Sequence, residues 1–181
     1  MDSHLSIFHG RGMRTIVFWI TVILVVIIDQ SAKAAVEVML AKGPKTIVPG
    51  VLDLVLVENT GAAFSFGQGA GLLFICAAVI FVAVSVFLVW RSPDMPIPLV
   101  ITIGLIAGGG VGNMVDRIMK GSVTDFFATT FIDFPVFNVA DICITVGIVC
   151  SFVGYMMWES RRGQEERVPV ATLHDDGADS V

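Results

Sequence analysis

Four long apolar stretches restrict most strongly what this 181-residue chain can fold into. A helix needs roughly 20 apolar residues to cross a bilayer, because each residue advances it by about 1.5 Å. Soluble domains are about a quarter charged, whereas here 55% of residues are hydrophobic and only 15% are charged. The sequence therefore predicts a mainly α, multi-pass membrane protein with four transmembrane helices. The predicted spans lie at about residues 14–35, 72–90, 97–115 and 138–158.

The first apolar run also has a second interpretation. Arg11 and Arg14 precede it and small residues follow it, a pattern similar to a cleavable signal peptide. However, helix-forming residues continue without Gly or Pro until Gly43. That length allows a helix of roughly 40 Å, which would span the membrane and project beyond it. We therefore predict a retained span, with Asp29 near its far boundary.

Two segments between the spans face the same side of the membrane. Residues 45–66 are rich in β-forming residues broken by turn dipeptides, which predicts a small antiparallel sheet on the membrane surface. Residues 120–137 are short and contain five phenylalanines. Aromatic rings at a membrane boundary are usually anchors, and we interpret these rings in that way.

The chain is predicted to form one membrane domain over residues 1–162, followed by a charged, disordered tail over residues 163–181. Four spans put both termini on one side. The basic residues on that side are Arg11, Arg14, Arg91, Arg161, Arg162 and Arg167, against Lys33, Lys42, Lys45, Arg117 and Lys120 opposite. The positive-inside rule then favours cytoplasmic termini, more strongly if Lys33 and Arg117 belong to a site. These residues form no basic patch, so a nucleic-acid partner is not expected.

Two carboxylates, Asp125 and Asp141, bracket the segment between the third and fourth spans. A charge at mid-bilayer costs roughly 2.5–3.5 kcal/mol, so such groups usually serve a site. If the two carboxyls lie close together they share a proton, and one can activate water while the other protonates the leaving group. Residue types alone leave a hydrolytic pair and a transporter's proton relay equally open. No His or Cys cluster accompanies them, so no metal or other cofactor is expected.

Two further groups of polar residues lie beside apolar runs. Asp29 and Lys33 are four residues apart on one helical face and can pair, either as a structural ion pair or as part of a site. Asn113, Asp116 and Arg117 form a second polar cluster at the end of the third span. An arginine there can be a membrane anchor, but the neighbouring Asn and Asp require a partner.

Five short motifs then occur in a fixed order. They are Asp29-Gln30-x-x-Lys33, Asn59-Thr60-Gly61-Ala62-Ala63-Phe64-Ser65, Gly112-Asn113-x-x-Asp116-Arg117, Val123-x-Asp125-Phe126 and Phe137-Asn138-x-Ala140-Asp141. Each motif is weak alone. In this order, on four spans in a short chain, they closely resemble the lipoprotein signal peptidase family, also called signal peptidase II, over about residues 14–158. One departure is Ala32, where a hydroxyl residue is common before the lysine.

The resemblance implies an intramembrane aspartic endopeptidase of the bacterial cytoplasmic (inner) membrane. It would remove the signal peptide from prolipoproteins, cutting just before a cysteine that carries diacylglycerol. Asp125 and Asp141 match the family's catalytic pair. The implied fold has four transmembrane helices, with a small extracytoplasmic β-cradle between helices 1 and 2 and the active site near that face. Positions that match residues shaping the site or holding the substrate are Asp29, Lys33, Asn59, Gly61, Asn113, Asp116, Arg117 and Asn138.

The expected partners are diacylglyceryl-prolipoprotein substrates and membrane lipid, and the protein is expected to be a monomer. A proton-coupled membrane transporter that uses the same carboxylates as a relay is the alternative function.

Overall fold

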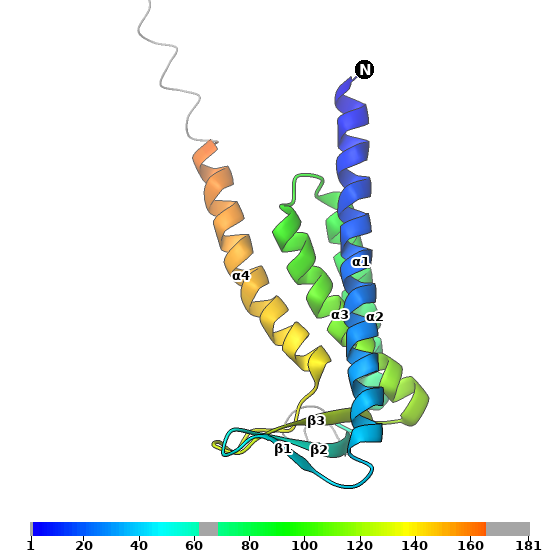
Figure 1. The fold of residues 1–181 in the computed structure, drawn as a ribbon. Helices are drawn as coiled ribbons and strands as arrows, with labels where there is room; N and C mark the ends of the chain where they lie inside the picture. Colours follow the sequence, from blue (N-terminus) through cyan, green and yellow to red (C-terminus); the bar gives the residue numbers. More distant parts are fainter. Residues whose placement is uncertain (1, 62–68, 166–181) are drawn as a thin grey trace, which may run out of the picture.

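The computed structural model describes residues 2–61 and 69–165, which form four long helices and one small sheet (Figure 1). The helices are α1 (Asp2–Met39), α2 (Gly71–Arg91), α3 (Ile97–Lys120) and α4 (Val139–Glu165). The strands are β1 (Lys45–Val48), β2 (Leu52–Asn59) and β3 (Val123–Thr129). Each helix contains a stretch long and apolar enough to cross a membrane, which confirms the prediction of four transmembrane helices. Figure 1 shows the sheet across one end of the bundle, with the start of α1 and the end of α4 at the other.

The outward faces of the helices are apolar. Ile20, Ile80 and Phe152 are exposed to 52%, 62% and 68%, and many other large hydrophobic side chains are similarly uncovered. In water such a surface would drive association, whereas lipid chains match it. Apolar side chains also fill the core between the helices, where Phe18 and Val100 are fully buried, and small residues line the closest helix contacts.

Helix α3 approaches α1 closely because glycines line the contact. These glycines recur once per turn and are Gly104, Gly108 and Gly112. A Cβ atom on Gly108 would lie 2.7 Å from the Cβ of Val25, and one on Gly112 would lie 2.6 Å from Oδ2 of Asp29. The glycine spacing predicts close packing of another helix, and the structure confirms it with α1 as the partner.

Helix α4 packs on another face of α3. A Cβ on Gly109 would lie 2.5 Å from the carbonyl oxygen of Ala140, and farther along the helices the Ser151 hydroxyl donates to Thr102 Oγ1 at 2.8 Å. Helix α2 also packs on α3, but within the described residues α2 and α4 share no extensive contact. Helix α3 therefore connects α2 to α4, with their facing sides left apart.

The sheet is antiparallel with the order β1-β2-β3, and its third strand was not predicted. The sequence predicts β structure only over residues 45–66, of which 62–66 lie outside the described part of the chain. Strand β3 instead comes from between α3 and α4, and it pairs Asp125 with Val57. The first four residues of β3 are all buried, so no alternation of polar and apolar residues marks the strand in the sequence.

Phe126 is a core residue, so its interpretation as a membrane anchor is wrong. Its side chain is 1% exposed and lies in one buried cluster with Val36 of α1, Leu40 directly after α1, and Leu54 of β2. Phe131, by contrast, is exposed. The cluster ties the sheet to the end of α1 that projects beyond the apolar run.

Helix α4 continues past the predicted domain boundary at residue 162 and ends at Glu165. Arg162 lies over the ring of Trp158 and forms an ion pair of 3.6 Å with Asp94. Both contacts are made by a residue beyond the apolar run that marked the predicted end of the helix. Residues 166–181, the rest of the predicted tail, lie outside the described residues.

Candidate active site

Asp125 is a buried carboxylate on β3. Its side chain is 2% exposed. Oδ1 accepts a hydrogen bond of 2.6 Å from Nδ2 of Asn138, and Oδ2 accepts one of 3.0 Å from Nδ2 of Asn59. Both carboxylate oxygens are therefore held by amide donors from other elements.

Asp141 lies in the first turn of α4, where a reciprocal pair of hydrogen bonds fixes it. The Asp141 backbone N–H donates to Oδ1 of Asn138 at 3.0 Å, and the Asn138 backbone N–H donates to Oδ2 of Asp141 at 3.1 Å. This is the geometry of a capping box, which satisfies free N–H groups at a helix start. The other carboxylate oxygen, Oδ1, accepts 2.8 Å from Nδ2 of Asn113. The local sequence thus both starts α4 and orients the carboxylate.

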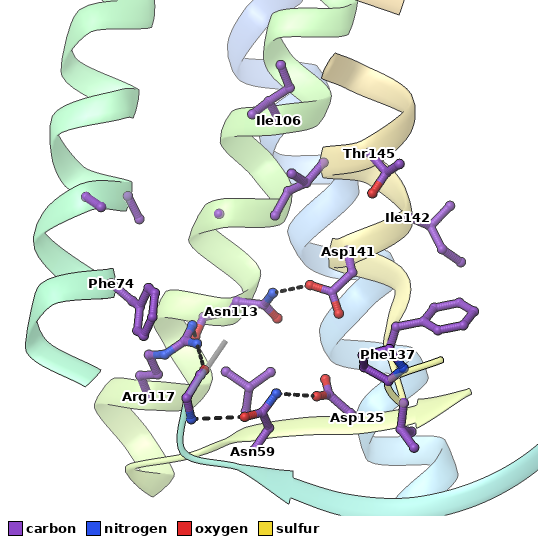
Figure 2. A pocket seen from close by; sticks show the side chains of 18 of the residues that line it. Asn59, Phe74, Ile106, Asn113, Arg117, Asp125, Phe137, Asp141, Ile142 and Thr145 are labelled. Atoms are coloured by element: carbon purple, nitrogen blue, oxygen red, sulfur yellow. Dashed lines mark hydrogen bonds between the residues drawn. The ribbon is translucent and has the colours of Figure 1, made fainter. Parts of the chain in front are cut away.

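Asn138 links the two carboxylates. It is fully buried and its Nδ2 donates to Asp125 and, at 3.1 Å, to Oδ1 of Asn113. Figure 2 shows Asp125 and Asp141 directed into the same pocket, with Asn113 bonded to Asp141 and Asn59 bonded to Asp125. The fold therefore brings together two carboxyls that are 16 residues apart in the chain.

Asn59 has both a turn-forming and a site-forming contact. Its Oδ1 accepts the backbone N–H of Gly61 at 2.9 Å, as expected of a turn residue. Because that N–H can only donate, the Asn59 oxygen must face it, and the amide NH₂ is left to face Asp125. The turn therefore determines which end of the amide the carboxylate meets.

Arg117 lies at the edge of the same polar group. Its guanidinium donates to the carbonyl oxygens of Gly61 at 2.7 Å and Asn113 at 3.3 Å, and it stacks over the Phe74 ring at 4.7 Å. The arginine thus joins α3 to the end of β2 and to α2. This position is in the site rather than in a free loop.

A pocket of about 730 Å³ opens beside these groups. Its charged and amide side chains gather at one end, while the rest of its wall is mainly apolar, with Thr145 as a polar exception, and comes from α2, α3, α4 and the segment before α4 (Figure 2). The polar lining residues at that end are Asn59, Asn113, Arg117, Asp125 and Asp141. The apolar lining includes Phe74, Ala77, Ala78, Phe81, Ile106, Ala107, Gly110, Phe134, Phe137, Ile142 and Val146. A long apolar ligand with one polar segment fits this distribution.

Behind the pocket lies a buried ion cluster formed by Asp29, Lys33 and Asp116. The Lys33 ammonium is 2.8 Å from Asp29 and 2.9 Å from Asp116, and none of the three side chains is more than 2% exposed. The pairing of Asp29 with Lys33 that their spacing predicts therefore forms. The cluster does not line the pocket. It touches the site through Lys33, which donates to Oδ1 of Asn113 at 3.0 Å.

Two hydrogen-bond donors that hold the site together were not predicted from the sequence. Gln30 donates to Asp116 at 3.0 Å and to the carbonyl oxygen of Gly112 at 3.1 Å, and the Thr124 backbone N–H donates to Asp116 at 3.0 Å. Gln30 stands in the first motif and could have been chosen by its position beside Asp29. The apolar pocket lining carries no such signal, because its residues resemble those that face lipid.

The pKa of Asp125 is raised to about 6 from an ordinary value of 3.8. Burial is the main cause, and the negative charge of Asp141 adds to it, whereas hydrogen bonds from Asn59 and Asn138 and the charge of Lys33 oppose it. The folded carboxyl therefore holds its proton more tightly than the unfolded one. As pH rises from about 4 to about 6, folding loses stability, because the unfolded state ionises first.

This linkage predicts a pH-dependent melting temperature. Between about pH 5 and about pH 7, Asp125 should lower the free energy of unfolding by about 1 kcal/mol. Thermal unfolding of the detergent-solubilised protein measures this change, and Asp125→Asn should remove that part of the pH slope. Asp53→Asn, a change on β2 outside the pocket, should keep it. An Asp125→Asn protein with the slope of the unmodified chain would contradict the assignment.

Known proteins similar to this chain in sequence are described as signal peptidases. A family model described as Signal peptidase (SPase) II matches residues 21–157. The chain is 38% identical over 145 residues to the lipoprotein signal peptidase of Lactiplantibacillus plantarum, covering 80% of this chain and 97% of that protein. It is 40% identical over 146 residues to the lipoprotein signal peptidase of Gloeobacter violaceus, covering 80% and 84%.

Solved structures show a matching fold. A bacterial membrane enzyme determined by the in meso method at 2.3 Å resolution is similar with a TM-score of 0.71 at 25% identity. The match covers 80% of this chain and 90% of that one. The arrangement of four helices and a small sheet therefore recurs in an experimentally determined membrane enzyme.

Proposed function

The chain belongs to the signal peptidase II family, and from this premise we propose that it is an intramembrane aspartic endopeptidase of the bacterial inner membrane. Membership of the family confirms the resemblance carried by the five sequence motifs. The proposed substrates are diacylglyceryl-modified prolipoproteins. The enzyme removes their signal peptides by cutting just before the lipidated cysteine.

One observation carries the aspartic mechanism: Asp125 and Asp141 line one pocket and both are hydrogen-bonded to Asn138. A buried carboxyl and a half-buried one so connected do not both ionise readily, and we propose that they share a proton as a pair. Each of their four oxygens accepts a hydrogen bond from a side-chain amide or a backbone N–H group. These donors hold the pair in place and leave its shared proton for the substrate.

The reaction follows from one ionised and one protonated carboxyl. The ionised carboxylate takes a proton from a water molecule, and the water oxygen bonds to the carbon of the scissile carbonyl. The protonated partner hydrogen-bonds the carbonyl oxygen and stabilises the charge that develops there. The carbon–nitrogen bond then breaks, and a proton from the pair passes to the leaving amine. No metal or cofactor takes part in these steps.

The substrate is proposed to enter sideways from the lipid, between α2 and α4. Both helices line the pocket, and within the described residues they share no extensive contact that would close it. Phe74, Phe81 and Ile142 offer an apolar wall to acyl chains and to an apolar signal helix. Gly110 lines the pocket on α3 without a side chain. The nearest atom to a Cβ at this position would be 3.8 Å away, so the space beside Gly110 is open.

Asn59 and Arg117 are proposed to hold the backbone of the scissile segment. Both line the polar end of the pocket and both already contact Gly61. An amide NH₂ and a guanidinium are donors that match peptide carbonyl oxygens. Rigid placement of the peptide beside Asp125 lowers the entropic part of the barrier.

The proposed orientation puts both termini in the cytoplasm and the active site near the extracytoplasmic face. Lys33 lies in the buried ion cluster and Arg117 beside the pocket, so neither counts as a free loop charge. The described basic residues left for comparison are Arg11, Arg14, Arg91, Arg161 and Arg162 at the terminal end, against Lys42, Lys45 and Lys120 at the sheet end. The positive-inside rule supports a cytoplasmic terminal end.

A cleavage assay tests the proposed function. The purified protein in detergent is incubated with a precursor peptide bearing a diacylglyceryl cysteine, and mass spectrometry identifies the products. One cut, immediately before the modified cysteine, is expected. The same peptide without the lipid is the matched control and should be cut much more slowly.

If the protein were instead a proton-coupled transporter, a flux measurement would detect its activity and the cleavage assay would not. Protein reconstituted in liposomes would carry a proton-coupled flux that substitution of Asp125 or Asp141 blocks, with no peptide product. Absence of any cleavage product from the lipidated precursor, under conditions where the protein is folded, would reject the endopeptidase proposal.

A further inference from the structure

The Lys33 ammonium uses all of its hydrogen-bonding capacity inside the protein. It contacts Asp29 Oδ2 at 2.8 Å, Asp116 Oδ2 at 2.9 Å and Asn113 Oδ1 at 3.0 Å. An ammonium group has three N–H donors and no acceptor, so each donor has one partner. Since Lys33 can only donate, the Asn113 oxygen must face it. The Asn113 amide NH₂ is consequently directed at Asp141.

Each carboxylate of the buried ion cluster accepts a backbone N–H from the residue directly before one of the two pocket aspartates. Asp29 Oδ1 accepts the N–H of Ala140 at 2.9 Å, and Asp116 Oδ2 accepts the N–H of Thr124 at 3.0 Å. Ala140 directly precedes Asp141, and Thr124 directly precedes Asp125. Lys33 bridges the two carboxylates.

We propose that the buried ion cluster of Asp29, Lys33 and Asp116 is a clamp that sets the separation of the two catalytic carboxyls. The proposal rests on the proposed function and assigns positioning roles to three residues that do not line the pocket. One arm, Asp29, holds the start of α4. The other arm, Asp116, holds β3, and Lys33 keeps the arms together.

A clamp is required because the two carboxyls sit on different elements. Asp125 belongs to a strand anchored on β2, whereas Asp141 belongs to a helix packed on α3. The sharing of a proton weakens steeply as charges separate, and displacements of about 1 Å can cost roughly 100-fold in rate. A direct tie between the two backbones removes that freedom.

The energetics argue against a purely stabilising role. A buried ion pair is often no more stabilising than well-packed apolar residues, because burial costs the charges their hydration. Here the cluster also needs space, since a Cβ on Gly112 would lie 2.6 Å from Asp29 Oδ2. The gain that offsets these costs is the fixed geometry of Asp125 and Asp141.

Lys33→Met tests the clamp. The variant is expected to lower kcat by roughly 100-fold while KM changes by no more than about threefold, because no pocket-lining residue is substituted and Asn138 still donates to the Asn113 oxygen. The pH–rate profile is also expected to narrow, since the coupling that separates its acid and alkaline limbs weakens. Both quantities are measured with the lipidated precursor peptide.

Lys33→Met leaves two buried carboxylates without their cation, which can unfold the protein. A second variant therefore tests the clamp without this charge imbalance. Asp29→Asn combined with Lys33→Met conserves the net charge of the cluster, and the Asn oxygen can still accept the Ala140 N–H. The same loss of kcat and the same narrowed profile are expected. The matched control is Ser151→Ala, which removes the hydrogen bond to Thr102 elsewhere on the α3–α4 contact. It should lower stability without changing kcat per folded molecule or the profile.

Two results would overturn the clamp. One is wild-type kcat and an unchanged profile in the double variant. The other is a loss of activity that matches the unfolded fraction, with the profile unchanged, which would make the cluster purely structural. Asp125→Asn in the same assay separates the two proposals: if that variant still cleaves, the aspartic mechanism fails, whereas its inactivity beside a fully active double variant rejects only the clamp.

Discussion

Replacing either Asp125 or Asp141 by Asn is expected to lower kcat for prolipoprotein cleavage by about 1,000-fold or more. General acid–base catalysis by one group contributes roughly 100- to 10,000-fold, and each carboxyl has a separate step to perform. Asn has nearly the shape of Asp and keeps one oxygen, so Asn138 can still donate to residue 125. Substrate binding should therefore change little, and the loss should fall on kcat. Single-turnover cleavage of the lipidated peptide measures it.

Asp53→Asn is the control for this prediction. Asp53 lies on β2, in the same sheet as Asp125, but pairs with Thr46 and Ala128 and does not line the pocket. Its substitution also removes one carboxylate, and cleavage should continue at the rate of the unmodified protein. Near-normal turnover by Asp125→Asn or Asp141→Asn, with the protein folded, would show that these carboxyls are not the catalytic pair.

Gly109→Ala is expected to lower the free energy of unfolding of the helix bundle by about 2 kcal/mol or more. The added Cβ would lie 2.5 Å from the carbonyl oxygen of Ala140 and 2.7 Å from Cγ1 of Ile144. Overpacking typically costs roughly 1–3 kcal/mol, and a backbone oxygen at a helix start yields less readily than a side chain. Since Ala140 directly precedes Asp141, cleavage should fall together with the melting temperature.

The neighbouring glycine supplies the comparison. A Cβ on Gly110 would meet only the Cβ of Ala78 at 3.8 Å, an ordinary contact. Alanine favours a helix by about 1 kcal/mol over glycine, so Gly110→Ala should melt no lower than the unmodified protein. Because Gly110 lines the pocket, only stability is compared. Equal melting temperatures for the two alanine variants would contradict the close α3–α4 packing.

Local features of the sequence were sufficient for the helices. The length of each apolar run predicts a span, the spacing of Asp29 and Lys33 predicts their pairing, and the four-residue recurrence of glycines predicts close packing of α3. These patterns are formed by residues near one another in the chain, so they can be recognised without the fold, whereas the helix that packs on the glycines, α1, is known only from the structure. The strand β3 could not be recognised in this way, because its first four residues are all buried and its partner β2 is more than 60 residues away.

The presence of Asp125 and Asp141 in one pocket is likewise a property of the tertiary structure. Their positions beside apolar runs, and the motifs around them, single out the two residues as candidates in the sequence alone. Their approach depends on β3 joining β2, on α4 starting at Asn138 against α3, and on Lys33 contacting both Asp29 and Asp116. Side-chain chemistry and helix length are properties of the chain, whereas the distance between two distant carboxyls is decided only when packing and buried charge pairing bring their elements together.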